Sequence, residues 1–382
     1  MEWLQKIGYI KSDTRREIKM YRVLHIMAGA DAGGISTVVL NYYRFIDRTV
    51  FHFDIAVTTD MIGQNAKQLV ELGAEIHRLP LKSNGIFAYE QALTTLLGEH
   101  HYDAIHVHEN ETSYIALKIA KKMGVKCRIA HSHTSSPYVS FKGELKRLSG
   151  CVLNYRYATN VIACGRLAGE RVFGKINMRR KKASVLPNAI DTARFQYDEN
   201  IRNVTREALG VEDRYVVGMV GRLSPEKNHL FALNFFRHVS TVISNAQLIL
   251  VGNGPDEDKI RGYVEKNDMS SCVMLLGRRD DVDHLYQAFD VLIMPSYYEG
   301  FPVVAVEGIA TGLPVLLSNK ITSELTFCES VKYLPLRKKL WANALLKTNI
   351  NLTRESKIDE LKNNNLDVTK TVKILEKIYL DE

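Results

Sequence analysis

Short apolar runs alternate with amphipathic stretches along most of the chain. Runs rich in β-branched and aromatic residues predict strands at Val23–Met27, Phe53–Val57, Glu75–Leu79, Ala104–His108, Cys127–His131, Asn160–Ala163 and Ser184–Leu186. Between them, apolar positions at helical spacing predict helices near Ile35–Phe45, Asn65–Leu72, Ala88–Gly98, Ser113–Met123 and Leu145–Tyr157. Such alternation is typical of a parallel sheet with helices on both faces.

The same alternation restarts after a polar stretch. The segment Leu186–Asp191, followed by Phe195 and a run rich in Asn and Arg, predicts a linker. Beyond it we expect strands at Tyr215–Val220, Gln247–Val251, Val273–Leu276, Val291–Met294, Val315–Leu317 and Lys332–Leu334, and helices near Asn228–Val242, Glu257–Lys266, Val282–Ala288 and Val303–Ala310. The predicted fold class is therefore α/β, with two Rossmann-like doubly wound domains that face each other across a cleft. Ligands in such folds lie beyond the carboxyl ends of the strands.

These patterns divide the chain into four parts. Residues 1–19 precede the first clean strand and form an N-terminal extension, residues 20–190 form the first domain, and residues 191–365 form the second. The last part, residues 366–382, carries apolar side chains such as Val372, Leu375 and Tyr379 at helical spacing. That spacing predicts a terminal helix that packs on one of the domains.

Composition narrows the class of protein. Of the 382 residues, 46% are hydrophobic and 25% are charged, which excludes a disordered or low-complexity chain. The five Cys form no CxxC pair, which argues against a disulfide scaffold and a structural zinc site. No apolar run approaches the ~18 residues of a spanning helix, and the N-terminus lacks the apolar centre of a secretory signal. The sequence therefore predicts a cytoplasmic protein.

Positive charge is concentrated in the first half. Residues 1–190 carry 27 Lys and Arg against 16 Asp and Glu, whereas residues 191–382 carry 24 against 27. The basic clusters are Lys142, Lys146 and Arg147, near Val152, Leu153 and Tyr155, and the run 179–182. Because no recognition helix or aromatic–basic interleaving fits a nucleic-acid module, we expect an anionic membrane surface as the partner. A merely solvated basic surface is the alternative interpretation.

Two loops that follow predicted strands are suited to an anion. In the first, Ala28–Ile35, Gly33 and Gly34 let the backbone pass close to a phosphate at the start of a helix. In the second, Arg222 and Lys227 both follow the end of one predicted strand. There the planar guanidinium of Arg222 and the compact ammonium of Lys227 can bind a diphosphate together.

A third loop adds two carboxylates and a helix start. Gly300 frees the turn, and Pro302 suits the first position of the helix that follows. On the second turn of that helix, Glu307 can accept both hydroxyls of a ribose, while Glu299 can reach a neighbouring sugar. The eight positions between them suit two parts of one nucleotide sugar.

The motifs together resemble a known family. Gly-Gly after the first strand, the run Gly221–Asn228, Val251–Pro255, and Glu299 with Glu307 as Glu-x7-Glu are similar to the retaining nucleotide-sugar glycosyltransferases of family 4, which have the GT-B fold. This resemblance covers nearly the whole chain after residue 20. The segment Ala130–Thr134 also resembles the branch that builds bacterial capsular polysaccharides and exopolysaccharides.

The resemblance implies an activity and a set of site residues. The reaction would move a hexose or hexosamine from a nucleotide-diphosphate sugar, of the UDP type, to a sugar hydroxyl of a lipid-linked acceptor, on the inner face of the plasma membrane. In the family's pattern Arg222 and Lys227 would bind the diphosphate, Glu307 the ribose and Glu299 the donor sugar. Further contacts are implied for the phosphates (amides of Gly33, Gly34, Phe301, Pro302 and Val303), for the base (Gly277–Arg279, with Arg278) and for the sugar's 6-hydroxyl (His131 or His133, His133 being slightly favoured).

Neither a metal nor a further cofactor is expected. Two Asp-x-Asp matches, Asp256–Asp258 and Asp281–Asp283, both precede predicted helices, where acidic residues act as caps. Two other functions fit the same motifs. One is a catalytically inert nucleotide-sugar-binding protein, and the other is a nucleotide-sugar epimerase with the same two domains.

Overall fold

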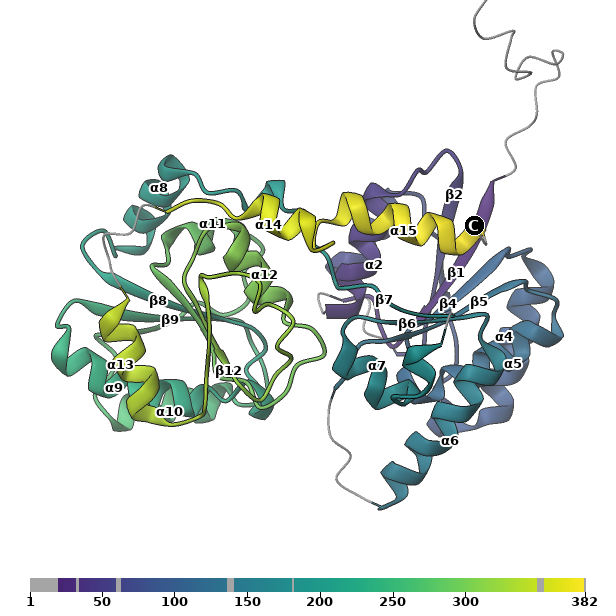
Figure 1. Cartoon of the computed structure of the whole chain (residues 1–382), viewed down its shortest axis with the longest axis horizontal. Coiled ribbons are helices and arrows are strands. Elements are labelled where there is room, and N and C mark those ends of the chain that lie inside the picture. Colours follow the sequence, from purple (N-terminus) through teal and green to yellow (C-terminus); the bar gives the residue numbers. More distant parts are fainter. Residues whose placement is uncertain are drawn as a thin grey trace, which may run out of the picture.

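The structure, a computed structural model, describes residues 20–31, 34–59, 63–135, 141–180, 182–348 and 354–380. Two lobes lie next to each other, and each is a parallel sheet covered by helices (Figure 1). The predicted extension, residues 1–19, lies outside the described residues.

Seven parallel strands form the first sheet, in the order β3-β2-β1-β4-β5-β6-β7. They are β1 (Tyr21–Met27), β2 (Phe51–Val57), β3 (Ile76–Arg78), β4 (Ala104–Val107), β5 (Cys127–Ser132), β6 (Asn160–Ala163) and β7 (Ala183–Val185). The helices of this lobe are α2 (Gly34–Phe45), α3 (Gln64–Glu71), α4 (Ile86–Glu99), α5 (Ser113–Lys122), α6 (Phe141–Tyr157) and α7 (Arg166–Phe173), with 3-10 turns η1 (Lys82–Asn84), η2 (Asn110–Thr112) and η3 (Asn177–Arg179).

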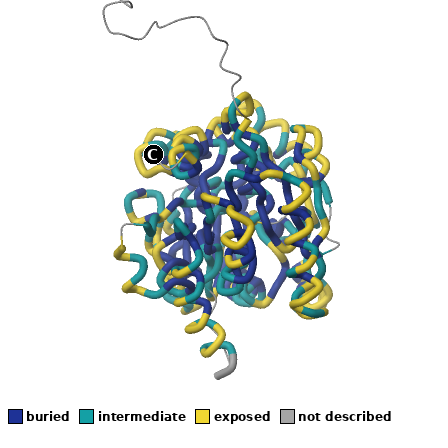
Figure 2. The backbone as a smooth tube through the Cα atoms, turned by 90° about the vertical axis from the view of Figure 1, so that its right-hand side faces the viewer, coloured by how far each residue is buried: buried dark blue, intermediate teal, exposed yellow. Residues whose placement is uncertain are grey.

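Helices cover both faces of this sheet because successive side chains of each strand point to opposite sides. On β1, Val23 packs into a cluster with α2, whereas Leu24 packs into a cluster with α4 and α5. The buried strands run through the middle of the molecule between more exposed helices (Figure 2).

The second sheet has six parallel strands in the order β10-β9-β8-β11-β12-β13. They are β8 (Tyr215–Val220), β9 (Ala246–Val251), β10 (Val273–Leu275), β11 (Val291–Met294), β12 (Val315–Ser318) and β13 (Val331–Leu334). Helices α8 (Glu199–Leu209), α9 (His229–Val242), α10 (Glu257–Lys266), α11 (Val282–Ala288), α12 (Val303–Ala310), α13 (Lys338–Lys347) and α14 (Ile358–Asn363) surround it, with 3-10 turns η4 (Ala193–Phe195) and η5 (Pro225–Lys227). The predicted fold class is confirmed.

One prediction for this region was wrong, because the polar stretch taken as a linker contains helix α8. The carboxylate of Asp198 accepts hydrogen bonds from the N–H groups of Asn200 (2.8 Å) and Ile201 (3.0 Å), and Gly210 ends the helix in the left-handed region with φ 64°. The segment was not predicted as a helix because its composition is polar, and α8 contacts its neighbours through charged groups.

The C-terminal segment returns to the first lobe. Helix α15 (Val368–Leu380) lies along that lobe beside α2 (Figure 1), and Val368, Val372, Leu375 and Tyr379 join the apolar cluster of β1 and β2. A bridge between Ile190 and Asp367 holds the two crossing segments together.

Candidate active site

The two sheets share a topological feature that places ligand sites. Strand order reverses between β1 and β4 in the first sheet and between β8 and β11 in the second, and loops at such switch points diverge to leave a crevice. Arg222 and Lys227 follow β8, whereas Glu299 follows β11. The structure therefore brings these three predicted residues to one switch point.

Backbone and amide hydrogen bonds join the two loops at this point. The N–H of Tyr297 donates to the carbonyl oxygen of Glu226 (2.8 Å), and Nδ2 of Asn228 donates to the carbonyl oxygen of Pro295 (3.1 Å). Asn228 adopts φ 63°, in the left-handed region that Asn tolerates better than most residues. The loops thus form one unit, and the positions of their charged side chains depend on each other.

Within this unit Lys227 and Glu299 form an ion pair. The ammonium nitrogen lies 2.7 Å from Oε1 of Glu299, and the two side chains are 18% and 11% exposed. Arg222, which leaves the same strand end, is exposed. A largely buried ammonium with an exposed guanidinium nearby can hold an anion with two formal charges.

Glu307 lies on α12, whose first residue is Val303. The hydroxyl of Tyr286 donates to its Oε2 (2.7 Å). Burial raises the pKa of Glu307 to about 7, against the lowering effects of the Tyr286 hydrogen bond and of Arg194. Pro302 precedes the first helical residue instead of occupying that position as predicted, and Phe301 is buried beside it.

The loop after β11 also contacts the first lobe. A Cβ atom on Gly300 would lie 1.9 Å from the carbonyl oxygen of His133, so only glycine allows this approach. The hydroxyl of Ser135 donates to the carbonyl oxygen of Glu299. Because of these contacts, the end of β5 lies against the loop that carries Glu299.

The two candidate histidines have different surroundings. His131 is fully buried, and its Nδ1 lies 3.0 Å from Nε2 of His106. His133 is half-buried at the contact with Gly300, and its backbone N–H donates to Oδ1 of Asn110 (3.0 Å). Of the pair, His133 is the one at the boundary between the lobes.

Sequence reasoning missed three further histidines, His25, His106 and His108, which are buried around the same strand ends. The signal was present as a repeated His-x-His spacing at positions 106 and 108 and at 131 and 133. Side chains two apart on a strand share a face, so two such pairs on paired strands meet.

Other predicted residues lie on loops that do not carry the ion pair. Gly34 begins α2, with no atom within 4 Å of where its Cβ would be, and Gly33 lies outside the described residues. Arg278, after the edge strand β10, reaches across to Asp31 of the first lobe (3.4 Å). A cavity of about 760 Å³ between the lobes is lined by Gln64 and Asp280 among others.

The expected role of the Asp-x-Asp acids as side-chain caps was wrong. Asp256 and Asp281 occupy cap positions, but neither side chain accepts a capping hydrogen bond. Instead, Asp281 pairs with Arg279 (2.5 Å) and Asp283 with Arg194 (2.7 Å). A nearby guanidinium is a stronger partner for a carboxylate than a backbone amide is.

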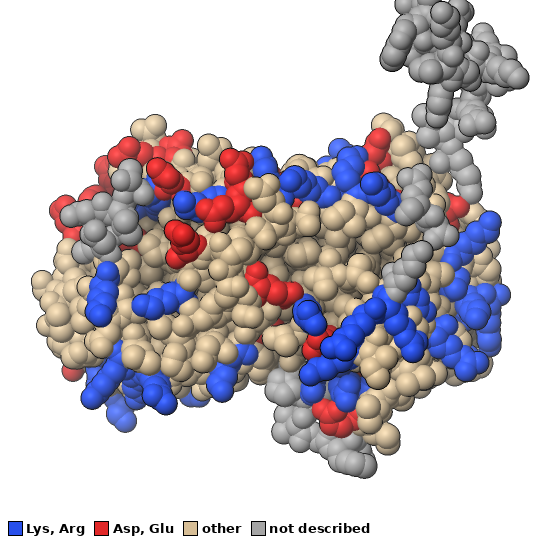
Figure 3. Space-filling view, in the orientation of Figure 1, with Lys and Arg blue, Asp and Glu red and all other residues tan. Residues whose placement is uncertain are grey.

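The basic half of the chain is visible on the surface. Lys and Arg side chains spread over the face of the first lobe, whereas acidic side chains gather on the upper part of the second (Figure 3). Helix α6 exposes an apolar stripe of Leu145 (59%), Leu148 (53%) and Val152 (64%). Tyr155, expected on the same surface, is half-buried beneath Lys182. Among the described residues, no helix has the length and apolar character needed to cross a bilayer.

Two family models match the chain. The model described as Glycosyltransferase Family 4 matches residues 32–194, and that described as Glycosyl transferases group 1 matches residues 201–331. A Bacillus subtilis protein named as a glycosyltransferase, EpsF, is 34% identical over 310 residues, 80% of each chain. The Escherichia coli UDP-Gal:alpha-D-GlcNAc-diphosphoundecaprenol alpha-1,3-galactosyltransferase is 27% identical over 240 residues, 60% of each chain.

Solved structures share the fold. HepE of Anabaena, in complex with UDP and glucose, aligns with a TM-score of 0.77 at 20% identity, over 94% of this chain and 99% of HepE. WaaG, a glycosyltransferase involved in lipopolysaccharide biosynthesis, aligns with a TM-score of 0.66 at 17% identity, over 94% of this chain and 98% of WaaG. The chain therefore belongs to the family 4 glycosyltransferases, with the GT-B fold.

Proposed function

We propose that the protein transfers a hexose or hexosamine from a UDP-sugar to a sugar hydroxyl of a lipid-linked acceptor, with retention of configuration at the anomeric carbon. The observation that carries this proposal is the position of Lys227 beside Glu299 at the switch point of the second sheet. The nature of the donor is supported by UDP and glucose in the HepE structure, and the acceptor by the name of the E. coli relative.

Each site residue then has one task. Arg222 and Lys227 bind the diphosphate, and the ammonium of Lys227 would exchange its contact with Glu299 for a phosphate oxygen. Glu299, once released, accepts a hydroxyl of the donor sugar, while Glu307 accepts the ribose hydroxyls. Gly34 at the start of α2 leaves open space for a phosphate to approach the helix N-terminus.

The reaction itself requires little covalent participation by the protein. The bond between the anomeric carbon and the phosphate oxygen breaks, the acceptor hydroxyl bonds to the same face of that carbon, and its proton passes to the leaving diphosphate. Negative charge grows on the diphosphate during this step, so fixed cations stabilise the transition state more than the ground state. We propose that Arg222 and Lys227 supply this charge without a metal ion.

The exposed stripe of α6 fits an acceptor held in a membrane. Leu145, Leu148 and Val152 follow one face of the helix, and Lys146 and Arg147 lie beside them. Apolar side chains flanked by cations bind the boundary of an anionic leaflet, and each cation contributes roughly 1 kcal/mol there.

This surface predicts salt-sensitive binding to vesicles that contain anionic lipid, measured by flotation. Replacing Leu145, Leu148 and Val152 together by Ser should remove most of the bound fraction. Val242→Ser is a matched control, because Val242 is an apolar side chain of the second lobe that is 58% exposed. Equal flotation of both variants would contradict the proposal.

Transfer is tested with full-length protein, a panel of UDP-sugars and a lipid-linked sugar acceptor, with chelator added. We expect release of UDP that depends on the acceptor, and a product whose anomeric configuration by NMR matches that of the donor. A new sugar nucleotide formed without acceptor would indicate an epimerase, and binding of donor without turnover would indicate an inert protein. Either result would overturn the proposed function.

A further inference from the structure

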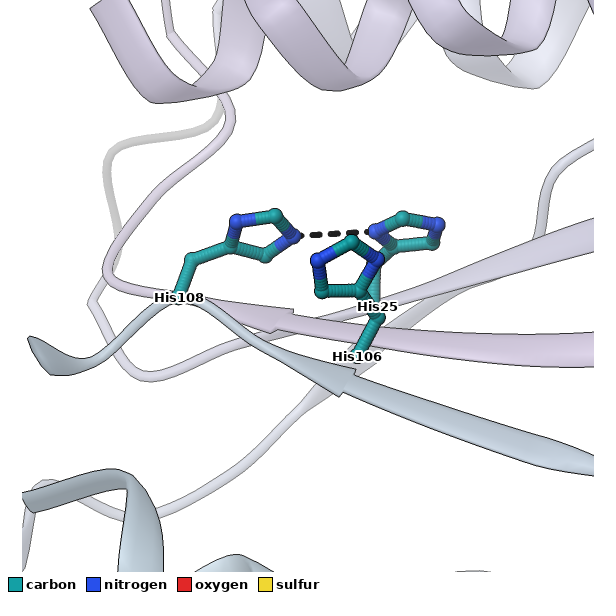
Figure 4. Close-up of side chains that lie close together, drawn as sticks. All are labelled: His25, His106 and His108. Carbon is teal, nitrogen blue, oxygen red and sulfur yellow. Dashed lines mark hydrogen bonds between the residues drawn. The ribbon is translucent and has the colours of Figure 1, made fainter. Parts of the chain in front are cut away.

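Six polar side chains that lie close together in the first lobe have no task in the transfer reaction proposed above, although the family resemblance implies a contact with the donor sugar for His131 or His133. They come from β1, β4, β5, the residues just after β4 and β5, and α15: His25, His106, His108, His131, His133 and Tyr379. Figure 4 shows three of them, with a hydrogen bond that joins His25 to His108 and the ring of His106 beside them. All except His133 are buried.

These groups are joined end to end. From Tyr379 one arm runs to Nδ1 of His106 (2.8 Å), whose Nε2 meets Nδ1 of His131 (3.0 Å). The other arm runs from the same hydroxyl to Nε2 of His25 (3.3 Å). Nδ1 of His25 then meets Nε2 of His108 (3.0 Å), and Nδ1 of His108 meets Nε2 of His133 (2.8 Å). We name this set the histidine chain. Each inner imidazole uses one nitrogen toward each neighbour.

The imidazoles are neutral because burial opposes their charged form. Burial lowers the pKa of His25 and of His133 to about 3, and it is the largest effect that holds the pKa of His106, His108 and His131 well below 6.5. A neutral imidazole carries one N–H and one acceptor nitrogen, and a tyrosine hydroxyl carries one hydrogen.

Hydrogen counting then leaves two arrangements. The six groups have one mobile hydrogen each, and five links join them, so one hydrogen remains at one end. If the Tyr379 hydroxyl donates to His106, every histidine of the chain carries its hydrogen on Nε2. If it donates to His25, every one carries its hydrogen on Nδ1.

The end near the cleft favours the second arrangement. At this end Nδ1 of His133 and Oδ1 of Asn188 are both buried and have no hydrogen-bond partner among the described residues, while the Asn188 side chain acts to raise the pKa of His133. With its hydrogen on Nδ1, His133 can donate to Asn188, whereas with its hydrogen on Nε2 the two atoms are both unpaired acceptors. At the far end, Nε2 of His131 has no partner among the described residues, and a bare acceptor is less costly there than an unpaired buried N–H.

We propose that the histidine chain is a single coupled unit in which all five imidazoles are Nδ1–H tautomers, and that Tyr379, on the C-terminal helix, is the positioning residue that couples its two arms. The inference rests on the proposed function only in its consequence for His133. In this state Nδ1 of His133, the outer nitrogen, is a donor toward Asn188, so the ring has no free acceptor nitrogen and does not remove a proton from the acceptor hydroxyl.

The wild-type protein provides the first test. In full-length chain with ¹⁵N-labelled histidine at pH 7.5, long-range ¹H–¹⁵N correlation spectra identify the tautomer of each ring, and His→Gln variants assign the signals. We expect the Nδ1–H form to exceed the other by roughly tenfold or more in all five rings. The exposed His238 is the internal control and should average both forms. Mixed tautomers among the five, or imidazolium signals, would overturn the proposal.

Two tyrosine variants test the coupling. Tyr379→Phe removes the shared hydroxyl, so His106 loses its acceptor, and we expect His106 and His131 to become mixtures of both tautomers. Tyr42→Phe is the matched control, because Tyr42 is buried in the same cluster and its hydroxyl has no partner among the described residues. Identical spectra for the two variants would contradict the coupling.

A metal ion is the remaining alternative occupant. Ring nitrogens of His25, His106 and His108, and of His108, His131 and His133, lie close enough together to share one. A stoichiometric transition metal in the purified protein would overturn the neutral chain, and elemental analysis measures it. Because the spectra need no substrate, they test the histidine chain independently of turnover: the expected tautomers in a protein that shows no sugar transfer would contradict the proposed function alone.

Discussion

Lys227 forms its ion pair with a carboxylate that is itself expected to contact the donor. The pair is 2.7 Å long and largely shielded from water, so neither charge is left without a partner while the donor is absent. A diphosphate offers the ammonium more negative charge than Glu299 does. We therefore propose that the ion pair holds the two side chains in position and that a bound donor would separate them.

This exchange predicts the effect of removing either cation. Arg222→Ala and Lys227→Ala should each lower kcat by about 10²–10³-fold, because each removes a donor of positive charge to the leaving group. Lys266→Ala, an exposed cation of the same lobe, is the control and should retain wild-type turnover. Steady-state kinetics with donor and acceptor measure the effect. Wild-type turnover in Arg222→Ala or in Lys227→Ala would contradict the proposal that both cations bind the diphosphate.

Glu307 predicts a pH dependence of donor binding. Its pKa is raised to about 7 by burial, so the carboxyl is largely protonated at pH 6 and ionised at pH 8. If Glu307 binds the ribose as proposed, the ionised form accepts hydrogen bonds from both hydroxyls more strongly than the protonated form, so affinity for UDP should increase as pH rises through 7 and then level off. Calorimetric titration at several pH values measures this increase. In Glu307→Gln the increase should be absent; if it persists, another group is responsible.

At the scale of elements, α8 shows how charged groups can secure a helix whose exposed surface is polar. The guanidinium of Arg206 is buried against the second lobe, where it donates to the carbonyl oxygens of Ala288 (2.7 Å) and Glu212 (3.1 Å) and lies 3.3 Å from Asp290. Composition alone predicts a linker here, because a buried Arg is rare and the partners of Arg206 at Ala288 and Asp290 lie far away in the sequence.

Removing this guanidinium should destabilise the second lobe. Arg206→Ala leaves Asp290 with one cation fewer and several buried carbonyl groups unpaired, so we expect a loss of about 3–5 kcal/mol in the free energy of unfolding. Urea denaturation measures it. Glu207→Ala, an exposed change on the same helix, is the matched control and should have little effect. Similar midpoints for the two variants would mean that Arg206 is not structurally important.

At the scale of the molecule, α15 connects the ends of the chain. It leaves the second lobe and packs against β1 and β2, so Tyr379 reaches side chains that lie more than 250 residues away. The helix therefore completes the core of the first lobe and supplies the hydroxyl at the middle of the histidine chain. The stability of the first lobe therefore depends on a segment that follows the second lobe in the sequence.

The buried histidines predict a loss of stability in acid. Their folded-state pKa values lie below the unfolded value of about 6.5, so the unfolded state binds more protons, and stability present above pH 6.5 is lost as pH falls toward about 3. His25 and His133 each contribute roughly 1.4 kcal/mol per pH unit in this range, and His106, His108 and His131 act in the same direction.

Urea denaturation at pH 7.5 and at pH 5 measures this loss, which should amount to several kcal/mol. Glu307 has the opposite sign, since its raised pKa favours the folded state at low pH. His238→Gln, an exposed change, should leave the dependence unaltered. Equal free energies of unfolding at the two pH values would contradict neutral burial of the histidines.

Local patterns were enough to predict most strands, the doubly wound class and the loops that carry Arg222, Lys227, Glu299 and Glu307. These features depend on side-chain periodicity and on residues that follow strand ends, both of which are visible along the chain. The histidine chain, the pairing of Lys227 with Glu299, the return of α15 to the first lobe and the burial of Arg206 depend on which distant segments pack together. Such contacts follow from the tertiary fold, because hydrogen bonds and desolvation act between groups that are close in space, whatever their separation in the sequence.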